Sequence, residues 1–186
     1  MTLQSIPPMH LTTSRLLLRE FRPADLDALF ALYGDPTYQR YEEPPLSREK
    51  TQARLEGFLA DAAVQPRTRF RLAITLPPAD TVIGKISLGA INPSIGEWEI
   101  GWGVAPRFWG QGYAPEAARA MLAYAFDTLN ARRVVAFCHF ENVRSQRVME
   151  KIGMQREGRP RQVRWLDDRW NDEYIYGILR QEFSDR

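Results

Sequence analysis

The sequence predicts one α/β domain, with a mixed β-sheet and about four flanking helices, across residues 1–186. The length fits a single domain that is large enough to bury a core. The composition, with 44% hydrophobic and 26% charged residues, is that of an ordinary globular protein. Short apolar runs of strand character alternate with amphipathic segments of helical period, and no repeat or linker separates them.

The first third predicts an extended lead-in, one strand and two helices. Residues 1–13 contain two adjacent prolines, which indicates an extended segment. Residues 15–20 have strand character. A helix opens at Pro23 and ends before a Gly-Asp-Pro turn. Ser47 is suited to cap a second helix over residues 48–63.

The middle of the chain predicts a three-stranded meander. Its strands cover residues 70–76, 81–91 and 97–104, and glycine- or proline-containing turns connect them. Pro106 follows the third strand and cannot donate a backbone hydrogen bond, so pairing is expected to stop there.

The last third begins with the clearest helix of the sequence, over residues 114–129. Pro115 and Glu116 suit its first turn, because that turn needs no N–H partner and attracts negative charge. A nearly continuous apolar strand follows at residues 132–140, which is typical of burial on both faces. We then expect a short helix over Asn142–Ile152, stopped by Gly153, and two strands that meet near Asp167 and Asp168, the second of them Trp170–Leu179.

A glycine-containing turn connects the strand at 97–104 to the long helix. Gly110 and Gly112 permit positive φ angles and let an anion approach the main chain. The N-terminus of the following helix has unpaired N–H groups and a partial positive charge. Arg107 lies at the rim, where it can pair with a phosphate. The turn is not a GxxxxGK[ST] phosphate loop, because the chain contains no such run. It is not a dinucleotide-binding fingerprint either, because the nearest match, Gly101-x-Gly103, lies inside a strand and Pro106 occupies the position of the third glycine.

Five separated stretches, in the right order, resemble the GNAT superfamily of acyl-CoA N-acyltransferases, and specifically its RimJ/RimL-like branch of ribosomal-protein N-terminal acetyltransferases. The resemblance covers essentially the whole chain, although Met154 stands where the family usually has Phe. The matching stretches are Leu11–Arg19, Glu99–Trp102, Trp109–Glu116, Asn142–Met154 and Trp170–Leu179.

This resemblance implies a strongly twisted mixed sheet that splays between its fourth and fifth strands, with acetyl-CoA bound there. It implies that the backbone of Val104 and the side chain of Asn142 hold the pantetheine arm, and that Ser145 occupies the family's serine position near the sulfur. An extended amide chain can add to a free strand edge like another strand. The residues implied to hold the pyrophosphate are Arg107, Phe108, Trp109, Gly110, Gln111, Gly112, Tyr113 and Ala114.

Acetyl transfer to an amine needs a neutral amine, a donor to the carbonyl oxygen and a proton for the departing thiolate. Glu99 and Glu97 are the leading candidates for the base, because strand alternation puts both on one face of the strand that leads to the splay. Glu42 and Glu43 are alternatives, and an ordered water also suffices for an α-amino group of pKa near 8. Ser145 is the candidate hydrogen-bond donor to the sulfur, and a helix-capping role is its alternative. Tyr113 and Tyr174 are alternative acids.

Charge and cysteine content exclude several other classes. The net charge of +2 does not indicate a binder of bulk polyanions. Acidic residues outnumber basic ones by 8 to 4 over residues 25–61, and basic outnumber acidic by 10 to 5 over residues 132–169. One half is suited to receive a cation and the other an anion, and the alternative is that both are solvated faces. The single cysteine, Cys138, is expected to be buried, and with two histidines the chain offers too few ligands for a metal. No apolar run spans a membrane and no signal peptide is recognised, so a cytoplasmic location is expected.

We therefore expect a cytoplasmic acetyl-CoA-dependent N-acetyltransferase that acts by direct attack in a ternary complex. The preferred acceptor is a protein N-terminus, for which a ribosomal protein is one option, and a small amine is the alternative. A CoA-binding sensor without activity is a rival of another class. RNA binding has only the arginine-rich stretch 156–169 in its favour, and no DNA partner is expected. A homodimer is left open.

Overall fold

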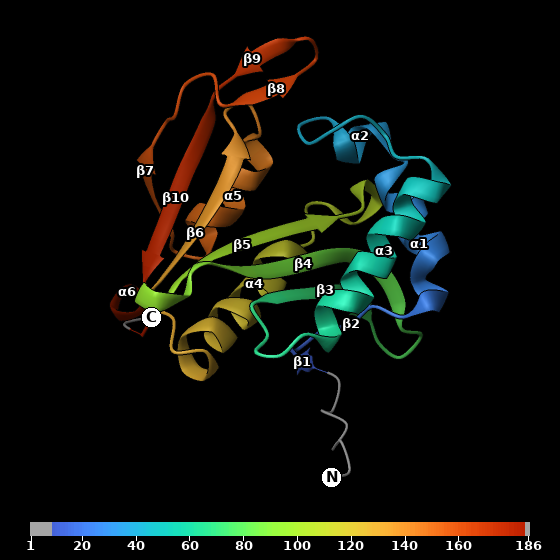
Figure 1. The fold of residues 1–186 in the computed structure, drawn as a ribbon, viewed down its shortest axis with the longest axis horizontal. Helices are drawn as coiled ribbons and strands as arrows, with labels where there is room; N and C mark the ends of the chain where they lie inside the picture. The colour runs from blue at the N-terminus through green and yellow to red at the C-terminus, as the bar shows by residue number, and fades with distance from the viewer. Residues whose placement is uncertain (1–8, 185–186) are drawn as a thin grey trace.

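A computed structural model describes residues 9–184 as one mixed eight-stranded sheet with helices on both faces (Figure 1). A separate two-stranded hairpin lies near the C-terminal end. The strands of the sheet follow the spatial order β1 (His10–Thr12), β2 (Leu17–Glu20), β3 (Arg69–Leu76), β4 (Thr81–Asn92), β5 (Glu97–Val104), β6 (Arg133–His139), β10 (Glu173–Leu179) and β7 (Gln155–Gly158), and the hairpin consists of β8 (Arg164–Leu166) and β9 (Arg169–Asn171).

The helices form two layers. Alternation along β3 places Ala73 toward α1 and α3, and Leu72 and Ile74 toward α4 on the other face. Helix α5 packs beside α4. The α-helices are α1 (Leu26–Tyr33), α2 (Pro36–Gln39), α3 (Arg48–Ala63), α4 (Tyr113–Ala123), α5 (Val143–Lys151) and α6 (Arg180–Ser184), and a π-helical turn, η4 (Tyr124–Thr128), extends α4.

Most of the expected elements are confirmed. The Ser47 hydroxyl accepts a hydrogen bond from the Lys50 N–H at 3.3 Å, and α3 buries Thr51, Leu55 and Phe58 at helical spacing. The meander is formed by β3, β4 and β5, with β5 bounded as expected. The sheet is mixed because β5 and β6 run parallel while the other neighbouring strands are antiparallel.

The described part of the lead-in is extended as expected and forms the edge strand β1, and the segment before Met9 lies outside the described residues. Two local expectations were wrong. The strand expected over Trp170–Leu179 is two strands, β9 and β10, in different sheets. Asp167 and Asp168, with φ of 52° and 54°, form a hairpin turn that pairs β9 with β8. Only the chain after Asp172 therefore joins the main sheet. Finally, α2 occupies a stretch for which no helix was expected.

Candidate active site

The central feature of the candidate site is a gap between β5 and β6. Their parallel pairing extends only from the Glu97–Arg133 pair to the Glu99–Val135 pair. The rest of β5 stays paired with β4 as far as Val104. One edge of β5 is therefore free of strand pairing over its C-terminal half. The resemblance implies such a splay, but the strands part after Glu99, well before Pro106, so the proline is not its cause.

Val104 presents its backbone to this gap. The Ala105 N–H donates to the Ile83 carbonyl of β4 at 2.8 Å. Because N–H groups of consecutive residues in a strand point to opposite edges, the Val104 N–H points away from β4 and into the gap. The Val104 carbonyl lies on the same edge and accepts a hydrogen bond from the Trp109 indole N–H at 2.6 Å. The N–H is therefore left for a ligand, whereas the carbonyl already has a protein partner.

The loop after β5 forms an anion cradle. Gly110 and Gly112 have φ of 77° and 82°, which confirms the backbone conformation expected for both. Nothing lies within 4 Å of the position that a Gly110 Cβ would take, so the main chain there is open to a ligand. Gly112 is the N-cap of α4 and supplies no capping side chain, so the first N–H groups of the helix are available. This arrangement fits a diphosphate group.

Two guanidinium groups lie beside the cradle. Arg107 stacks on Phe108, with 4.9 Å between the guanidinium and the ring centre, and Arg144 of α5 lies 4.3 Å from the Trp109 ring. Within residues 9–184, neither arginine has a carboxylate partner. Their positive charge is therefore available to a bound anion.

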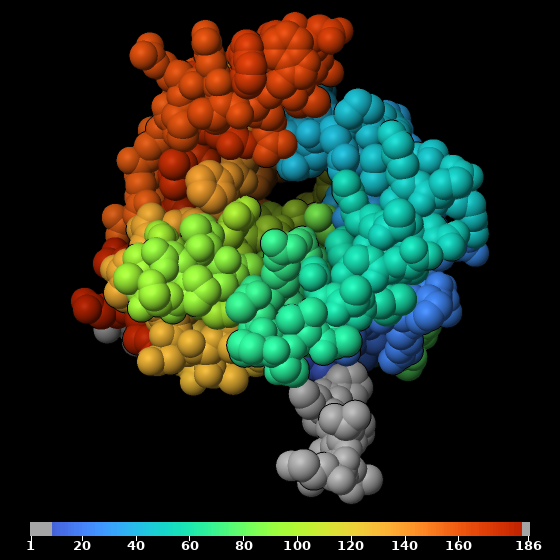
Figure 2. Space-filling view, in the orientation of Figure 1, coloured from blue at the N-terminus to red at the C-terminus, as the bar shows by residue number. Residues whose placement is uncertain are grey.

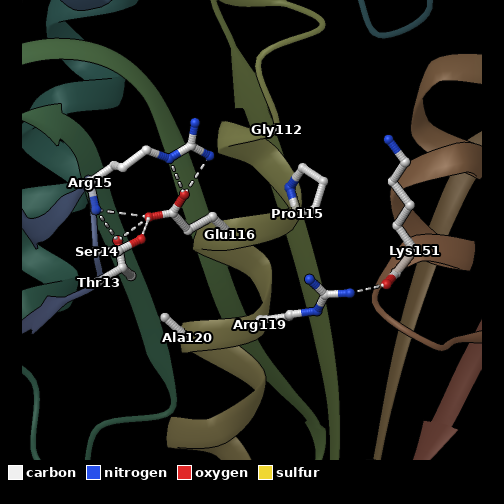
Figure 3. A pocket seen from close by; sticks show the side chains of 9 residues that line it. All are labelled: Thr13, Ser14, Arg15, Gly112, Pro115, Glu116, Arg119, Ala120 and Lys151. Atoms are coloured by element: carbon white, nitrogen blue, oxygen red, sulfur yellow. Dashed lines mark hydrogen bonds and ion pairs between the residues drawn. The ribbon is translucent and has the colours of Figure 1, made fainter. Parts of the chain in front are cut away.

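Glu116 fixes the start of α4 (Figure 3). Its carboxylate accepts hydrogen bonds from the Thr13 hydroxyl at 2.6 Å and from the Arg15 Nε–H at 2.7 Å. Burial opposes the charge, but these hydrogen bonds outweigh it and hold the pKa of Glu116 below its usual range. A pocket of about 560 Å³ lies beside this contact and extends to Arg119 and Lys151. The cradle thus rests on a helix terminus that is tied to the β1–β2 turn.

Glu99 and Glu97 share the sheet face covered by α1 and α3, as alternation predicts. That face follows from register, because Ala73 pairs with Lys85 and Lys85 with Gly103. The Glu99 side chain reaches solvent and has no ion-pair partner in the described part of the chain. Desolvation by the surrounding protein nevertheless raises its pKa, and the charge of Glu173 adds to this effect while Arg71 opposes it.

Glu97 lies at the paired end of β5, away from the open edge. Its carboxylate accepts a hydrogen bond from the Arg133 Nε–H at 3.0 Å, and Arg133 also binds Glu157 of β7. Its negative charge is therefore already balanced within the sheet. This environment differs from that of Glu99, whose carboxylate has no such partner.

Asn142 and Ser145 lie at the start of α5, next to the cradle. The Asn142 side-chain oxygen accepts a hydrogen bond from the Ser145 N–H at 3.1 Å, so Asn142 is the helix cap. The capping role considered for Ser145 is therefore filled by another residue. The contact between Arg144 and Trp109 places this helix terminus against the loop. The strand edge, the cradle and the α5 terminus consequently meet at one place.

A hollow opens on the α1 and α3 side of the gap. Figure 2 shows it between the cyan segment around α2, the green strands and the orange C-terminal strands. Arg164 of β8 spans its rim, because its guanidinium contacts Glu173 at 2.5 Å and Glu42 at 3.5 Å. Arg54 binds Glu43 at 2.5 Å. Of the carboxylates named around this hollow, Glu99 alone lacks an arginine partner.

Comparison with known proteins decides the family. Residues 15–155 match the family model described as the acetyltransferase (GNAT) domain. The chain belongs to the GNAT acetyltransferase family. It is 37% identical to an uncharacterized N-acetyltransferase, YnaD, of Bacillus subtilis, over 95% of this chain and 100% of that protein. It also resembles a crystal structure of a GNAT-family acetyltransferase from Bacillus anthracis, with a TM-score of 0.83, 32% identity, and coverage of 94% and 100%.

A third relative matches only in part. The ribosomal-protein-serine acetyltransferase of Escherichia coli is 31% identical over 100 residues, which are 54% of this chain and 56% of that protein. These comparisons establish this GNAT protein as an acyl-CoA-dependent N-acetyltransferase that uses acetyl-CoA. The mixed eight-stranded sheet matches the fold of the GNAT structure from Bacillus anthracis.

Three contacts between distant segments near the gap were not anticipated from the sequence. Arg164 was seen only as part of a basic stretch, and its reach to Glu42 depends on the hairpin. His139 lies buried at the end of β6 and stacks on Tyr41, with 5.1 Å between ring centres. Tyr38 of α2 lies against β5 at Gly103. No local pattern marks these contacts, because each joins segments that are far apart in the chain.

Other expectations can be stated briefly. Cys138 is buried as predicted, and burial raises the pKa of its thiol to about 12. Within residues 9–184, no cluster of three or more histidine, cysteine or acidic side chains is arranged to hold a metal ion. Over the same range, no helix is both long enough and apolar enough to cross a membrane.

Proposed function

We propose that this acetyltransferase modifies the α-amino group of a protein N-terminus, by direct attack in a ternary complex with acetyl-CoA. The observation that supports this most is the carboxylate of Glu99, which, unlike Glu42, Glu43 and Glu173 around the same hollow, forms no ion pair with any residue that the structure describes. It favours an acceptor with one ammonium group. Glu42, Glu43 and Glu173 are balanced by Arg164 and Arg54, so they offer less to the several charges of a polyamine.

Acetyl-CoA supplies an activated acetyl thioester. On the donor side, the loop from Arg107 to Ala114 holds the diphosphate against its N–H groups, and the Val104 N–H donates to the thioester carbonyl oxygen. A preorganised donor of this kind contributes about 3 kcal/mol in enzymes where one has been removed. The Asn142 amide group hydrogen-bonds the pantetheine arm. When the amine nitrogen bonds to the acetyl carbon, the C–S bond breaks, and a proton lost from that nitrogen passes to the thiolate, which the Ser145 hydroxyl hydrogen-bonds.

On the acceptor side, Glu99 takes the proton of the incoming ammonium, directly or through one water. Its raised pKa brings it closer to neutrality, where a general base is most effective. Glu97 shares the sheet face, but its ion pair with Arg133 leaves it less suited to this role. An α-amino group has a pKa near 8, so it needs less assistance than a lysine.

The RimJ/RimL-like branch is part of this proposal. Its support is the partial similarity to the Escherichia coli ribosomal-protein-serine acetyltransferase, together with the five matching stretches of sequence. A ribosomal protein is accordingly one acceptor to test. Small amines are the second candidate, because acidic residues outnumber basic ones by 8 to 4 over residues 25–61.

The test is a product analysis by mass spectrometry. The protein is incubated with acetyl-CoA and, separately, with peptides bearing a free N-terminus, the same peptides with a blocked N-terminus and one internal lysine, and spermidine. We expect acetylation of the free N-terminus and much slower reaction of the other two. Preference for spermidine would overturn the proposed acceptor. Binding of acetyl-CoA without any product would favour a sensor.

A further inference from the structure

Tyr38 occupies a fixed position beside the open edge of β5. It lies in the short helix α2, whose N-cap is Asp35, and its N–H donates to the Asp35 carboxylate at 3.2 Å. Its ring makes an edge contact with Tyr33, with 6.1 Å between ring centres, and packs against the core formed by α1 and α3. Packing on two sides and a helix cap restrict the ring to one place.

The ring lies on Gly103, the residue before Val104. A Cβ on Gly103 would stand 2.7 Å from two carbons of the Tyr38 ring and closer still to its hydroxyl. Real Cβ atoms do not come that close to other heavy atoms. The Tyr38 phenol therefore takes the space that a side chain at residue 103 would fill, which explains why this strand position is glycine.

This contact is on the acceptor face. Gly103 pairs with Lys85 of β4, whose ammonium lies 5.5 Å from the centre of the Tyr33 ring of α1. The neighbouring Val104 N–H points into the gap from the same strand. The Tyr38 phenol thus lies one residue from the backbone donor to which the thioester carbonyl is assigned.

We propose that Tyr38 is a specificity-determining residue that limits the transferred acyl group to acetyl. The inference rests on the proposed placement of the thioester at Val104, and it does not depend on which amine is the acceptor. The phenol and the bare backbone of Gly103 form a short wall at the end of the acyl site. A longer chain meets the ring, whereas an acetyl methyl does not.

The hydroxyl gives this wall an uncharged polar end. Burial holds the pKa of Tyr38 well above its usual range, and the negative charge of Glu42 adds to the effect. The phenol therefore stays protonated at neutral pH. Because the size of this wall depends mainly on the Tyr38 ring, Tyr38→Phe is expected to keep the preference for acetyl and Tyr38→Ala to lose it.

The experiment measures kcat/KM and calorimetric affinity for acetyl-, propionyl- and butyryl-CoA. Discrimination against one added methylene in a shaped pocket is about 10- to 200-fold. We expect the wild type and Tyr38→Phe to prefer acetyl-CoA within this range, and Tyr38→Ala to raise the propionyl-to-acetyl ratio at least tenfold. Tyr38→Leu, which removes less volume, should give an intermediate ratio and replaces Tyr38→Ala if that variant does not fold.

A matched control removes a half-buried tyrosine elsewhere. Tyr124 packs edge-on against Phe70 on the opposite face of the sheet, so Tyr124→Ala should leave the acyl ratio unchanged. A second check is Gly103→Ala, which should be destabilising alone and tolerated together with Tyr38→Ala.

The outcomes separate this inference from the proposed acceptor. An unchanged acyl ratio in folded Tyr38→Ala or Tyr38→Leu would overturn the inference, even with normal acetylation of peptides. Failure of the wild type to acetylate any peptide would overturn the proposed acceptor alone, because the affinity ratio for the acyl-CoA series needs no acceptor.

Discussion

Replacing Glu99 by glutamine removes one charge and almost no volume. Since Glu99 has no ion-pair partner among the described residues, the change breaks no salt bridge. We expect kcat/KM at pH 7 to fall about 100-fold, the lower end of the range for loss of a general base, because an α-amino acceptor needs modest help. The KM for acetyl-CoA should stay within a factor of about two, since the cradle is untouched.

The loss of kcat/KM in Glu99→Gln is expected to depend on pH, which distinguishes proton removal from other causes. Above about pH 9 the acceptor amine is already neutral, so the difference between Glu99→Gln and the wild type should shrink. The assay is initial-rate release of CoA thiol from pH 5.5 to 9.5, with one free N-terminal peptide as acceptor. A rate deficit of the same size at every pH would contradict proton removal by Glu99.

The thermal stability of Glu99→Gln is a control, because the raised pKa of Glu99 fixes the direction in which Tm should change with pH. A carboxyl group whose pKa is raised in the folded state stabilises the fold only at low pH, and that stabilisation is lost as the pH rises through the folded pKa. At neutral pH, Glu99→Gln should therefore unfold at the same temperature as the wild type or slightly above it, and the two should converge near pH 4. A clear drop in Tm would mean that the lost activity reflects damage to the fold.

Three further changes test the rest of the site. Glu97→Gln removes the ion pair with Arg133, so it should lower Tm through a loss of about 1 kcal/mol in the free energy of unfolding. The shape of the pH–rate profile should stay unchanged. Loss of the low-pH limb of that profile would instead assign the base role to Glu97. Gly112→Trp should abolish measurable binding of acetyl-CoA in calorimetry, because a side chain is strained at a φ of 82° and would meet the Arg15 guanidinium, which distorts the loop. Retained affinity would refute the loop assignment. Ser145→Ala should reduce kcat more than affinity for acetyl-CoA, and equal losses in both would indicate a structural role.

Much of this site could be predicted because its signals are local. Gly110 and Gly112 show positive φ from residue type alone, and Pro106 marks where β5 leaves its ladder. The strand face of Glu99 follows from simple alternation. These features can be predicted because each depends only on a few adjacent residues.

What could not be predicted depends on partners distant in the sequence. Glu97 and Glu99 look alike in the strand, and only the register with β6 shows that Arg133 neutralises one of them. The contact of Tyr38 with Gly103 needs α2, a four-residue helix that has no periodic signal. The turn at Asp167 and Asp168 was located correctly, but which sheet β9 would join depends on packing rather than on composition.

The indole of Trp109 uses one of the two lone pairs of the Val104 carbonyl, so a chain added at this edge could pair there only by sharing that acceptor. In the proposed mechanism the Val104 N–H serves the thioester carbonyl. The pantetheine arm would therefore be held by other groups, among them the Asn142 amide, and not by a regular strand ladder at Val104.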